Sequence, residues 1–289
     1  MTFDKLWKHP QVIRLVELGL QEDFGQTPHS SLTAIPKGTK GVAQMIAKSD
    51  GIVAGLPLAN TIFQQINPSI EVEQLVSEGQ KVIRGTILMK IQGESTDILS
   101  GERLILNFIQ RLSGIATVAN HYAELAKPYG VKILDTRKTT PGMRLLEKYA
   151  VKAGGAENHR IGLFDMIMLK DNHIDFCGSI TQAIHKTLDY LKQNKLQLKI
   201  EIETRNLDEV KEACAVGNIH RIMLDNFSPS QIIEALKIID KRFETEASGG
   251  ITDENLLEYL KTGVDYISVG ALTHSVKSMD ISLKTIIQK

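Results

Sequence analysis

The sequence predicts an α/β protein in two parts, a small mixed α+β domain followed by an incomplete (β/α) barrel. Between residues 130 and 270, short apolar strands alternate with amphipathic helices, which is the pattern of βαβ units around a parallel sheet. The first 100 residues instead carry short strands separated by glycines, with few helices. We therefore expect residues 1–115 to form the α+β domain, to which the C-terminal helix could also belong. Residues 116–289 then form the barrel domain, with most of the functional site.

Six strand candidates indicate the barrel. They cover residues 131–136, 165–170, 198–204, 220–225, 243–248 and 265–270. Start signals for the helices between them are Thr140 with Pro141, Asn206 with Glu209, Ser228 with Pro229, and Thr252. Six strands are fewer than the eight of a complete (β/α) barrel, so we expect an incomplete or distorted one.

The α+β domain is predicted from shorter segments. Helices are expected near residues 10–20 and over residues 56–66. Strands are expected over residues 41–49, 70–76 and 85–93. The segment from Ser100 to Lys127 predicts helices broken near Ser113 and Gly114, and these helices join the two domains.

Composition and charge exclude several classes of protein. The 289 residues are 42% apolar and 24% charged, as in an ordinary soluble globular protein. The formal net charge is zero, so no whole-molecule field attracts nucleic acid or an anionic membrane. Two distant cysteines, Cys177 and Cys214, suit a reducing compartment. The N-terminus is unlike a signal peptide, and no apolar run reaches the ~20 residues of a membrane span, so we expect a cytoplasmic protein.

Charged residues gather where the predicted barrel strands end. Arg137 and Lys138 follow the first strand, in the stretch LDTRKTTPG, and Lys170 follows the second. Glu203 and Asp225 lie at the ends of the third and fourth. For a lone Arg-Lys pair, a solvated loop is the better explanation. Charged ends on four successive strands favour a site instead, because the carboxyl ends of barrel strands form the active-site face.

The third strand, LKIEIET, places charge inside the barrel. If Leu198, Ile200 and Ile202 face the helices, then Lys199, Glu201 and Glu203 face inward. Inward charges are costly unless they are paired or functional. We expect Glu203, nearest the barrel mouth, to be functional and Glu201 to be structural.

Small residues follow the last two strands. They are Ser248, Gly249 and Gly250 in ASGGIT, and Gly270 and Ala271 in SVGALTHS. Such loops let backbone N–H groups approach an anion, and barrels often bind phosphate after their last two strands. Tight turns alone are the alternative for either loop. With the cations and carboxylates, these loops predict a polyanionic substrate and oxygen ligands that suit Mg²⁺ or sugar hydroxyls.

Several stretches are long and ordered enough to be matched to a known family. They are LDTRKTTPGMRLLEKYAVKAGGAENHRIGLFDMIMLKDNH, ERLILNFIQRLSGIAT, LDNF, SGGI and GVDYISVGALTHS. In these motifs, and over nearly the whole chain, the sequence resembles quinolinate phosphoribosyltransferase, also called nicotinate-nucleotide pyrophosphorylase (carboxylating). The resemblance implies that quinolinate and phosphoribosyl pyrophosphate give nicotinate mononucleotide, pyrophosphate and CO₂ in NAD biosynthesis. It also implies an N-terminal open sandwich domain, a C-terminal α/β barrel, and a homodimer or a multiple of one.

Site residues are carried over from the family motif by motif. The resemblance implies quinolinate binding by Arg103, Thr136, Arg137, Lys138, His159 and Arg160. Arg103, which would otherwise be assigned as a surface charge, would reach across the dimer interface. The resemblance places Lys170 where the two substrates meet. Ser248, Gly249, Gly250, Val269, Gly270 and Ala271 would bind the 5′-phosphate of the sugar.

The catalytic set implied by the resemblance is Lys138, Lys170, Glu203 and Asp225. Glu203 and Asp225 would hold ribose hydroxyls and Mg²⁺, the metal through water. No organic cofactor is expected. No two histidines have zinc spacing, so no tightly bound transition metal is expected either.

Two other functions stay open on the residues. One is a barrel aldolase or decarboxylase that uses Lys170 as a Schiff-base amine. The other is a non-catalytic relative that binds a phosphorylated metabolite. The number of additional cations favours phosphoribosyl transfer over an aldolase, and the presence of the matched site residues argues against a simple binder.

Overall fold

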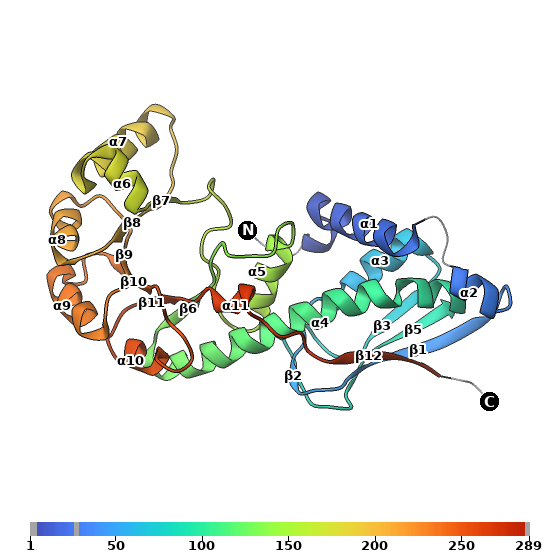
Figure 1. Cartoon of the computed structure of the whole chain (residues 1–289). Helices are drawn as coiled ribbons and strands as arrows, with labels where there is room; N and C mark the ends of the chain where they lie inside the picture. Colours follow the sequence, from blue (N-terminus) through green and yellow to red (C-terminus); the bar gives the residue numbers. More distant parts are fainter. Residues whose placement is uncertain (1–4, 26–28, 287–289) are drawn as a thin grey trace. The chain divides into compact units, whose positions relative to one another are not determined.

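The computed structural model describes residues 5–25 and 29–286, and these pack as two units (Figure 1). The first, which we call the sandwich unit, draws its described residues from 1–120, 139–155 and 272–289. The second, which we call the barrel unit, comprises residues 121–138 and 156–271. By packing, two segments beyond residue 115 thus belong with the N-terminal part of the chain.

The sandwich unit contains helices and an antiparallel sheet. Its helices are η1 (Leu6–Lys8), α1 (Pro10–Phe24), α2 (His29–Ala34), α3 (Leu58–Ile66), α5 (Arg144–Ala153) and most of α4 (Ser95–Ala126). Its strands are β1 (Lys40–Ala47), β2 (Gly51–Ile52), β3 (Glu71–Gln74), β4 (Lys81–Val82), β5 (Ile87–Glu94) and β12 (Ile281–Ile286). These confirm the helices expected near residues 10–20 and over 56–66, and the three strands expected in the α+β domain.

The main sheet of the sandwich unit includes the C-terminal strand of the chain. Its strand order is β12-β1-β5-β3, and all pairs are antiparallel. The expected C-terminal helix was wrong, because this segment is strand β12. Apolar Ile281 and Leu283 alternate with polar Ser282 and Lys284, which is the period of a strand, and β1 offers its edge for pairing.

Helix α4 is continuous, so the break predicted near Ser113 and Gly114 was wrong. Ser113 is fully buried, and its hydroxyl oxygen accepts a hydrogen bond of 3.1 Å from the N–H of Ala54. A Cβ at Gly114 would lie 2.4 Å from the carbonyl oxygen of Lys277. These small residues therefore let other backbone segments approach the helix and do not end it. Among the described residues, no helix has both the length and the apolar character to cross a membrane.

The barrel unit confirms all six predicted strands. They are β6 (Lys132–Leu134), β7 (Ile167–Leu169), β8 (Ile200–Thr204), β9 (Arg221–Asp225), β10 (Glu244–Ser248) and β11 (Tyr266–Ser268). The parallel strand order is β6-β11-β10-β9-β8-β7, so β6 and β7 are the two edges and the sheet is not closed. Beside β6, a single parallel bridge joins Leu134 to Glu157. An incomplete barrel was therefore the correct expectation.

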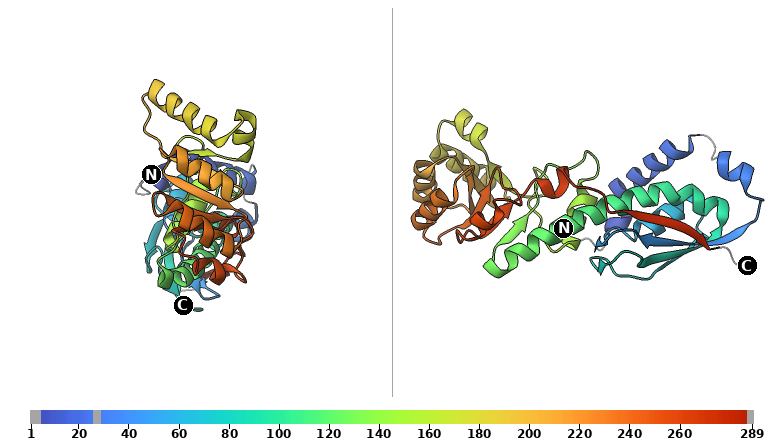
Figure 2. Two further views of the ribbon diagram at one scale, coloured as in Figure 1. Left: turned by 90° about the vertical axis from the view of Figure 1, so that its left-hand side faces the viewer. Right: turned by 60° about the horizontal axis from the view of Figure 1, so that its bottom comes forward.

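Helices of the barrel unit lie along the outer side of its strands (Figures 1 and 2). They are α6 (Asp171–Cys177), α7 (Ile180–Gln193), α8 (Leu207–Val216), α9 (Pro229–Ile239) and α10 (Leu256–Leu260). The short η2 (Lys127–Tyr129) precedes β6, and α11 (Ala271–His274) follows β11. Ile200 and Ile202 of β8 are buried, as the predicted alternation requires, while Glu201 and Glu203 point from the other face.

Two of the predicted helix starts are confirmed, and two were too early. Ser228 caps α9 in a capping box with Gln231, and Asn206 accepts hydrogen bonds from the first turn of α8. Helix α5, in contrast, begins at Arg144 and not at Thr140, because the carbonyl of Thr140 accepts the Met143 N–H in a separate turn. Similarly, α10 begins at Leu256, after a turn that follows Thr252.

Candidate active site

The end of strand β6 is tied to the segment that carries His159 and Arg160. Asp135, which is fully buried, accepts 2.7 Å from the side-chain amide of Asn158 and 2.9 Å from the N–H of His159. Asp135 directly precedes Thr136, Arg137 and Lys138. One carboxylate therefore brings together the two segments that hold the predicted dicarboxylate-binding cations.

Arg137 and Arg160 lie near each other as two cations. Burial, and next the positive charge of Arg137, lower the pKa of Arg160. Arg160 also donates 3.3 Å to the carbonyl of Met166. The Nε of Arg137 is buried without a hydrogen-bond partner among the described residues. A buried, unsatisfied guanidinium N–H next to a second guanidinium is a binding site for an anion.

The same loop also contains Thr136 and Lys138. The hydroxyl oxygen of Thr136 accepts 3.0 Å from the N–H of Lys138, which shapes the turn after β6. Lys138 is exposed. Arg103, the remaining predicted cation, lies on the exposed side of α4 in the sandwich unit, whereas all other predicted site residues belong to the barrel unit.

Lys170, Glu203 and Asp225 form a second charged group at the ends of β7, β8 and β9. The Lys170 Nζ donates 2.7 Å to Oε2 of the nearly buried Glu203. The Nδ1 of His173 accepts 3.0 Å from the Lys170 N–H and so fixes the start of α6. Burial, and next the charge of Glu203, raise the pKa of Asp225, while Lys170 lowers it. Asp225, whose charge is disfavoured by the charge of Glu203, would gain from an added cation.

The loop after β10 contains two successive glycines with positive φ. Gly249 has φ of 91°, and a Cβ there would lie 2.3 Å from the side-chain oxygen of Asn226. Gly250 has φ of 63°, and its carbonyl accepts 3.0 Å from the Asn255 amide. Only glycine fits this turn without strain.

Val269 differs from the other residues of the loops after β10 and β11. Its side chain is buried, and its N–H donates 2.9 Å to the Leu134 carbonyl in the sheet. Gly270 and Ala271 follow it, where α11 begins. The N–H of Val269 is therefore engaged in the sheet, and its buried side chain packs behind the loop.

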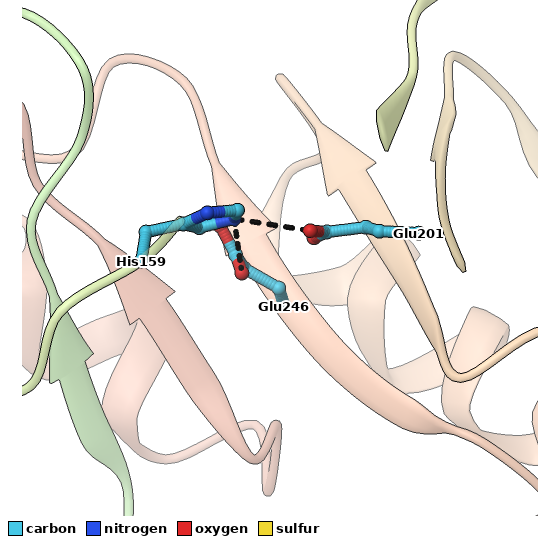
Figure 3. A group of neighbouring side chains, drawn as sticks. All are labelled: His159, Glu201 and Glu246. Atoms are coloured by element: carbon cyan, nitrogen blue, oxygen red, sulfur yellow. Dashed lines mark ion pairs between the residues drawn. The ribbon is translucent and has the colours of Figure 1, made fainter. Parts of the chain in front are cut away.

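A third group of charges lies inside the barrel unit, around His159 (Figure 3). The Nε2 of His159 lies 3.0 Å from Oε2 of Glu201 and 3.4 Å from Oε2 of Glu246. Both glutamates are fully buried. Arg221 donates 2.8 Å to Glu246 from Nη1, and its guanidinium carbon lies 4.0 Å from the centroid of the Tyr266 ring. We call His159, Glu201, Glu246 and Arg221 the interior charge group.

The two glutamates of this group differ in protonation. Burial, and next the charge of Glu246, raise the pKa of Glu201 to about 7. Burial alone would raise the pKa of Glu246 as well, but His159 and Arg221 outweigh it and lower that pKa. Glu246 is therefore the ionised partner of Arg221, and Glu201 takes up a proton near neutral pH.

The sequence analysis missed Glu246 and Arg221. Glu244 and Glu246 alternate in β10 as Glu201 and Glu203 do in β8, so the rule for inward-facing charge could have found Glu246. His159, Glu201 and Glu246 offer ligand atoms within 4.8 Å of one another, which could hold a metal ion. Arg221 already pairs with Glu246, so this carboxylate has a cationic partner without a metal ion.

Comparisons with known proteins agree on one family. The model described as "Quinolinate phosphoribosyl transferase, C-terminal domain" matches residues 115–284, and that of the N-terminal domain matches residues 27–113. The chain is 46% identical over 285 residues to "Quinolinate phosphoribosyltransferase [decarboxylating] 2, mitochondrial" of Nicotiana glauca, covering 93% of this chain and 81% of that protein. It is 42% identical over 271 residues to "Probable nicotinate-nucleotide pyrophosphorylase [carboxylating]" of Synechocystis, covering 92% and 90%.

Solved structures show the same relationship. The nicotinate-nucleotide pyrophosphorylase from Francisella tularensis has a TM-score of 0.91 and 40% sequence identity, over 99% of this chain and 100% of that chain. The structure titled NadC from Streptococcus pyogenes has a TM-score of 0.90 and 35% identity, over 96% and 98%. Both halves of the chain thus have counterparts in single relatives.

Proposed function

Since the chain belongs to the quinolinate phosphoribosyltransferase family, we infer that it transfers the phosphoribosyl group of phosphoribosyl pyrophosphate to quinolinate with loss of CO₂. The products are nicotinate mononucleotide and pyrophosphate, in the synthesis of NAD. The ring nitrogen forms a bond to the ribose carbon from which pyrophosphate departs. The alkylated ring then accepts the electrons of the breaking C–C bond, and the carbon that loses CO₂ takes up a proton.

One observation carries this inference, the anion site formed by Arg137 and Arg160. Quinolinate has two adjacent carboxylates, and planar guanidinium groups bind carboxylates through paired, charge-assisted hydrogen bonds. Here the Nε of Arg137 is buried without a partner, and the charge of Arg137 disfavours that of Arg160. A dicarboxylate would accept a hydrogen bond from the Nε of Arg137 and would reduce the repulsion between the two guanidinium groups. Thr136, Lys138 and His159 lie next to these arginines in the chain and complete the proposed quinolinate site.

Lys170, Glu203 and Asp225 are proposed to act on the sugar side. The Lys170 ammonium, held by Glu203 at 2.7 Å, is placed to stabilise negative charge where the two substrates meet. Glu203 and Asp225 accept hydrogen bonds from the ribose hydroxyls. Their oxygens also fit Mg²⁺, which prefers carboxylates and water as ligands. Besides burial, the charge of Glu203 raises the pKa of Asp225, and this supports a cation bound near both carboxylates. When bound, Mg²⁺ would neutralise charge on the pyrophosphate.

The two glycine loops are proposed to bind the 5′-phosphate. Ser248, Gly249 and Gly250 would bind it from one loop and Gly270 with Ala271 from the other, with Val269 as support behind them. Positive φ at Gly249 and Gly250 supports this role, because residues without a Cβ adopt this turn freely and let an anion approach the backbone closely. Catalysis by such a site depends on preorganised charge and orientation, without a covalent nucleophile.

A homodimer, or a multiple of one, is proposed to complete the site. Arg103 is exposed on α4, and in the assembly it would reach the quinolinate site of a second copy. Action in the cytoplasm remains a prediction from the sequence.

A Schiff-base aldolase or decarboxylase is disfavoured by the state of Lys170. Its amine donates a short hydrogen bond to Glu203 and so does not stand as a free nucleophile. A non-catalytic phosphometabolite binder would need no unsatisfied arginine beside a second one, since a single anion site would serve it.

An assay of both products tests the inference. The purified protein would be given quinolinate, phosphoribosyl pyrophosphate and Mg²⁺, with CO₂ and nicotinate mononucleotide followed together. Nicotinic acid would replace quinolinate in a parallel reaction. We expect equal amounts of both products from quinolinate and no turnover of nicotinic acid. Absence of turnover with quinolinate, from folded protein, would contradict the function.

A further inference from the structure

We propose that Glu201 and Glu246 are positioning residues that fix the quinolinate-binding Arg160 through the ring of His159. This deepens the proposed function and rests on it, because Arg160 has a ligand to position only if the anion site binds quinolinate. Neither glutamate would touch the substrate. Both are fully buried inside the barrel unit.

The two ring nitrogens of His159 face groups of opposite character. Nε2 lies within 3.4 Å of carboxylate oxygens of both Glu201 and Glu246 (Figure 3). A lone pair on Nε2 would face those oxygens unfavourably, so Nε2 carries a hydrogen. Nδ1 accepts 2.7 Å from the backbone N–H of Arg160 and therefore carries none. These contacts assign the neutral tautomer with the hydrogen on Nε2.

This tautomer connects the barrel interior to the anion site. Nε2 lies at ion-pair distance from both carboxylates, although it makes no hydrogen bond of good geometry to them, and Nδ1 accepts the hydrogen bond of the Arg160 N–H. The carboxylate of Asp135 accepts a hydrogen bond from the backbone N–H of His159. The backbone at both His159 and Arg160 is thereby fixed, and the Arg160 side chain starts from a defined position. Such pre-positioning lowers the cost of ordering the guanidinium when a carboxylate binds.

The charges of the interior group allow this tautomer. Arg221 lies within 3.1 Å of carboxylate oxygens of both Glu244 and Glu246, so its positive charge is shared between two carboxylates and does not fix the charge of His159. Only the neutral ring leaves Nδ1 a lone pair for the Arg160 N–H.

The neighbouring carboxylates nevertheless favour a second proton on the His159 ring. Burial lowers the pKa of His159, but the contacts with Glu201 and Glu246 outweigh burial and raise it to about 9, which on its own favours a cationic ring at neutral pH. The 2.7 Å contact of the Arg160 N–H with Nδ1 requires a lone pair on that nitrogen, and the assignment of the neutral ring rests on this geometry. The Arg160 N–H opposes that proton directly, because an imidazolium cannot accept a hydrogen bond at Nδ1. The Arg160 N–H is therefore held only by the neutral ring.

Two substitutions at one position separate positioning from packing. In E201L, the ring loses an acceptor for Nε2–H, while in E201Q the amide oxygen can accept it without a charge. We expect E201L to raise the KM for quinolinate about tenfold, with the KM for phosphoribosyl pyrophosphate within about twofold of wild type. E201Q should restore the quinolinate KM to within about threefold of wild type.

Glu244 and Glu246 supply a matched pair on one strand. Both bind Arg221, but Glu244 is partly exposed and accepts from the Tyr266 hydroxyl, whereas Glu246 contacts His159. We expect E246Q to raise the KM for quinolinate about fivefold or more, and E244Q to leave it within about twofold. Equal effects of E244Q and E246Q would show that both act only through Arg221 and would overturn the inference.

The nitrogen-15 resonances of the His159 ring complete the test without any substrate. At pH 7.5, we expect Nε2 to be protonated and Nδ1 to be unprotonated in the wild-type protein. Protonation of both nitrogens would overturn the inference, as would an E201L variant with the quinolinate KM of wild type. A wild-type protein that does not turn over quinolinate would instead overturn the proposed function, and the inference with it.

Discussion

Two arginines, one in each unit of the protein, show how a structural charge differs from a binding charge. Arg111 of the sandwich unit donates to the buried Glu147 from Nε and Nη2, at 2.8 and 2.6 Å, and to the Thr140 hydroxyl at 2.8 Å. Arg137 of the barrel unit has a buried Nε without a partner and lies beside another arginine. The first is satisfied by the fold. The second is left for a ligand.

The interior charge group combines features of the structural charge and of the binding charge. Arg221 is matched by Glu244 and Glu246, as Arg111 is matched by Glu147. Nδ1 of the His159 ring, however, accepts a hydrogen bond from the N–H of Arg160 at the anion site. Nε2 of His159 and oxygens of Glu201 and Glu246 also lack hydrogen-bond partners among the described residues, but they lie at ion-pair distance from one another, whereas Arg137 lies beside another cation. The comparison therefore teaches that the charge of the neighbours, and not burial alone, separates supporting charges from functional ones.

Removal of Arg111 should have the largest effect on stability. The substitution R111M keeps much of the apolar stem but leaves the fully buried Glu147 without its charged partner. We expect the free energy of unfolding to fall by about 3 kcal/mol, which is typical when one member of a buried ion pair is removed. Urea unfolding measures this. An unchanged midpoint would mean that Arg111 is not the structural charge of the comparison.

Removal of Arg137 should act on activity instead. The substitution R137A takes away charge-assisted hydrogen bonds to a quinolinate carboxylate, so kcat/KM for quinolinate should fall about a hundredfold. The free energy of unfolding should change by less than about 0.5 kcal/mol, because no described residue loses a hydrogen bond to Nε. Steady-state kinetics and urea unfolding of one preparation give both numbers. A stability loss as large as that of R111M would contradict the distinction.

The pH dependence of stability should reveal the interior charge group. The folded-state pKa of Glu201 is raised to about 7, above the usual value of the unfolded chain. For such an acid the folded state binds the extra proton, so its contribution to stability falls as pH rises through this window, up to about 7. E201Q removes this contribution. The unfolding free energy of E201Q relative to wild type should therefore increase between pH 5 and 7.5, and a constant difference would oppose a raised pKa.

The smallest expected effect is at the cap of helix α9, which contacts none of these arginines through its side chain. Ser228 caps α9 through the N–H of Gln231, so S228A should lower the free energy of unfolding by about 1 kcal/mol. Since the cap binds no substrate, both KM values should stay as in wild type. A change in either KM would show that the loop before α9 takes part in substrate binding.

Most of the barrel could be predicted because its signals are local. Each strand is a short apolar run, and Ser228 with Pro229 marks a helix start without reference to the rest of the chain. Strand β12 could not be placed in this way, since six residues with period-two alternation do not indicate which edge they pair with. Gly114 likewise reads as a break until the carbonyl of Lys277 is found beside it.

In the candidate site, too, features set by local sequence were predictable, and contacts between distant segments were not. Charged strand ends such as Arg137 and Glu203 were predictable, because their position in the barrel is fixed by the strands themselves. The partnership of His159 with Glu246 was not, since it joins residues far apart in sequence that only the curved sheet brings together. The unsatisfied Nε of Arg137 is also invisible in the sequence, which shows a charge but never its partners.

Calorimetric titration with quinolinate and with nicotinic acid tests the central claim most directly. If Arg137 is left unsatisfied in order to bind a second carboxylate, the wild-type protein should bind quinolinate at least about tenfold more tightly than nicotinic acid, which has only one. R137A should lose most of this difference while it stays folded. Equal affinities of the wild-type protein for both ligands, or an unchanged preference in R137A, would contradict the account.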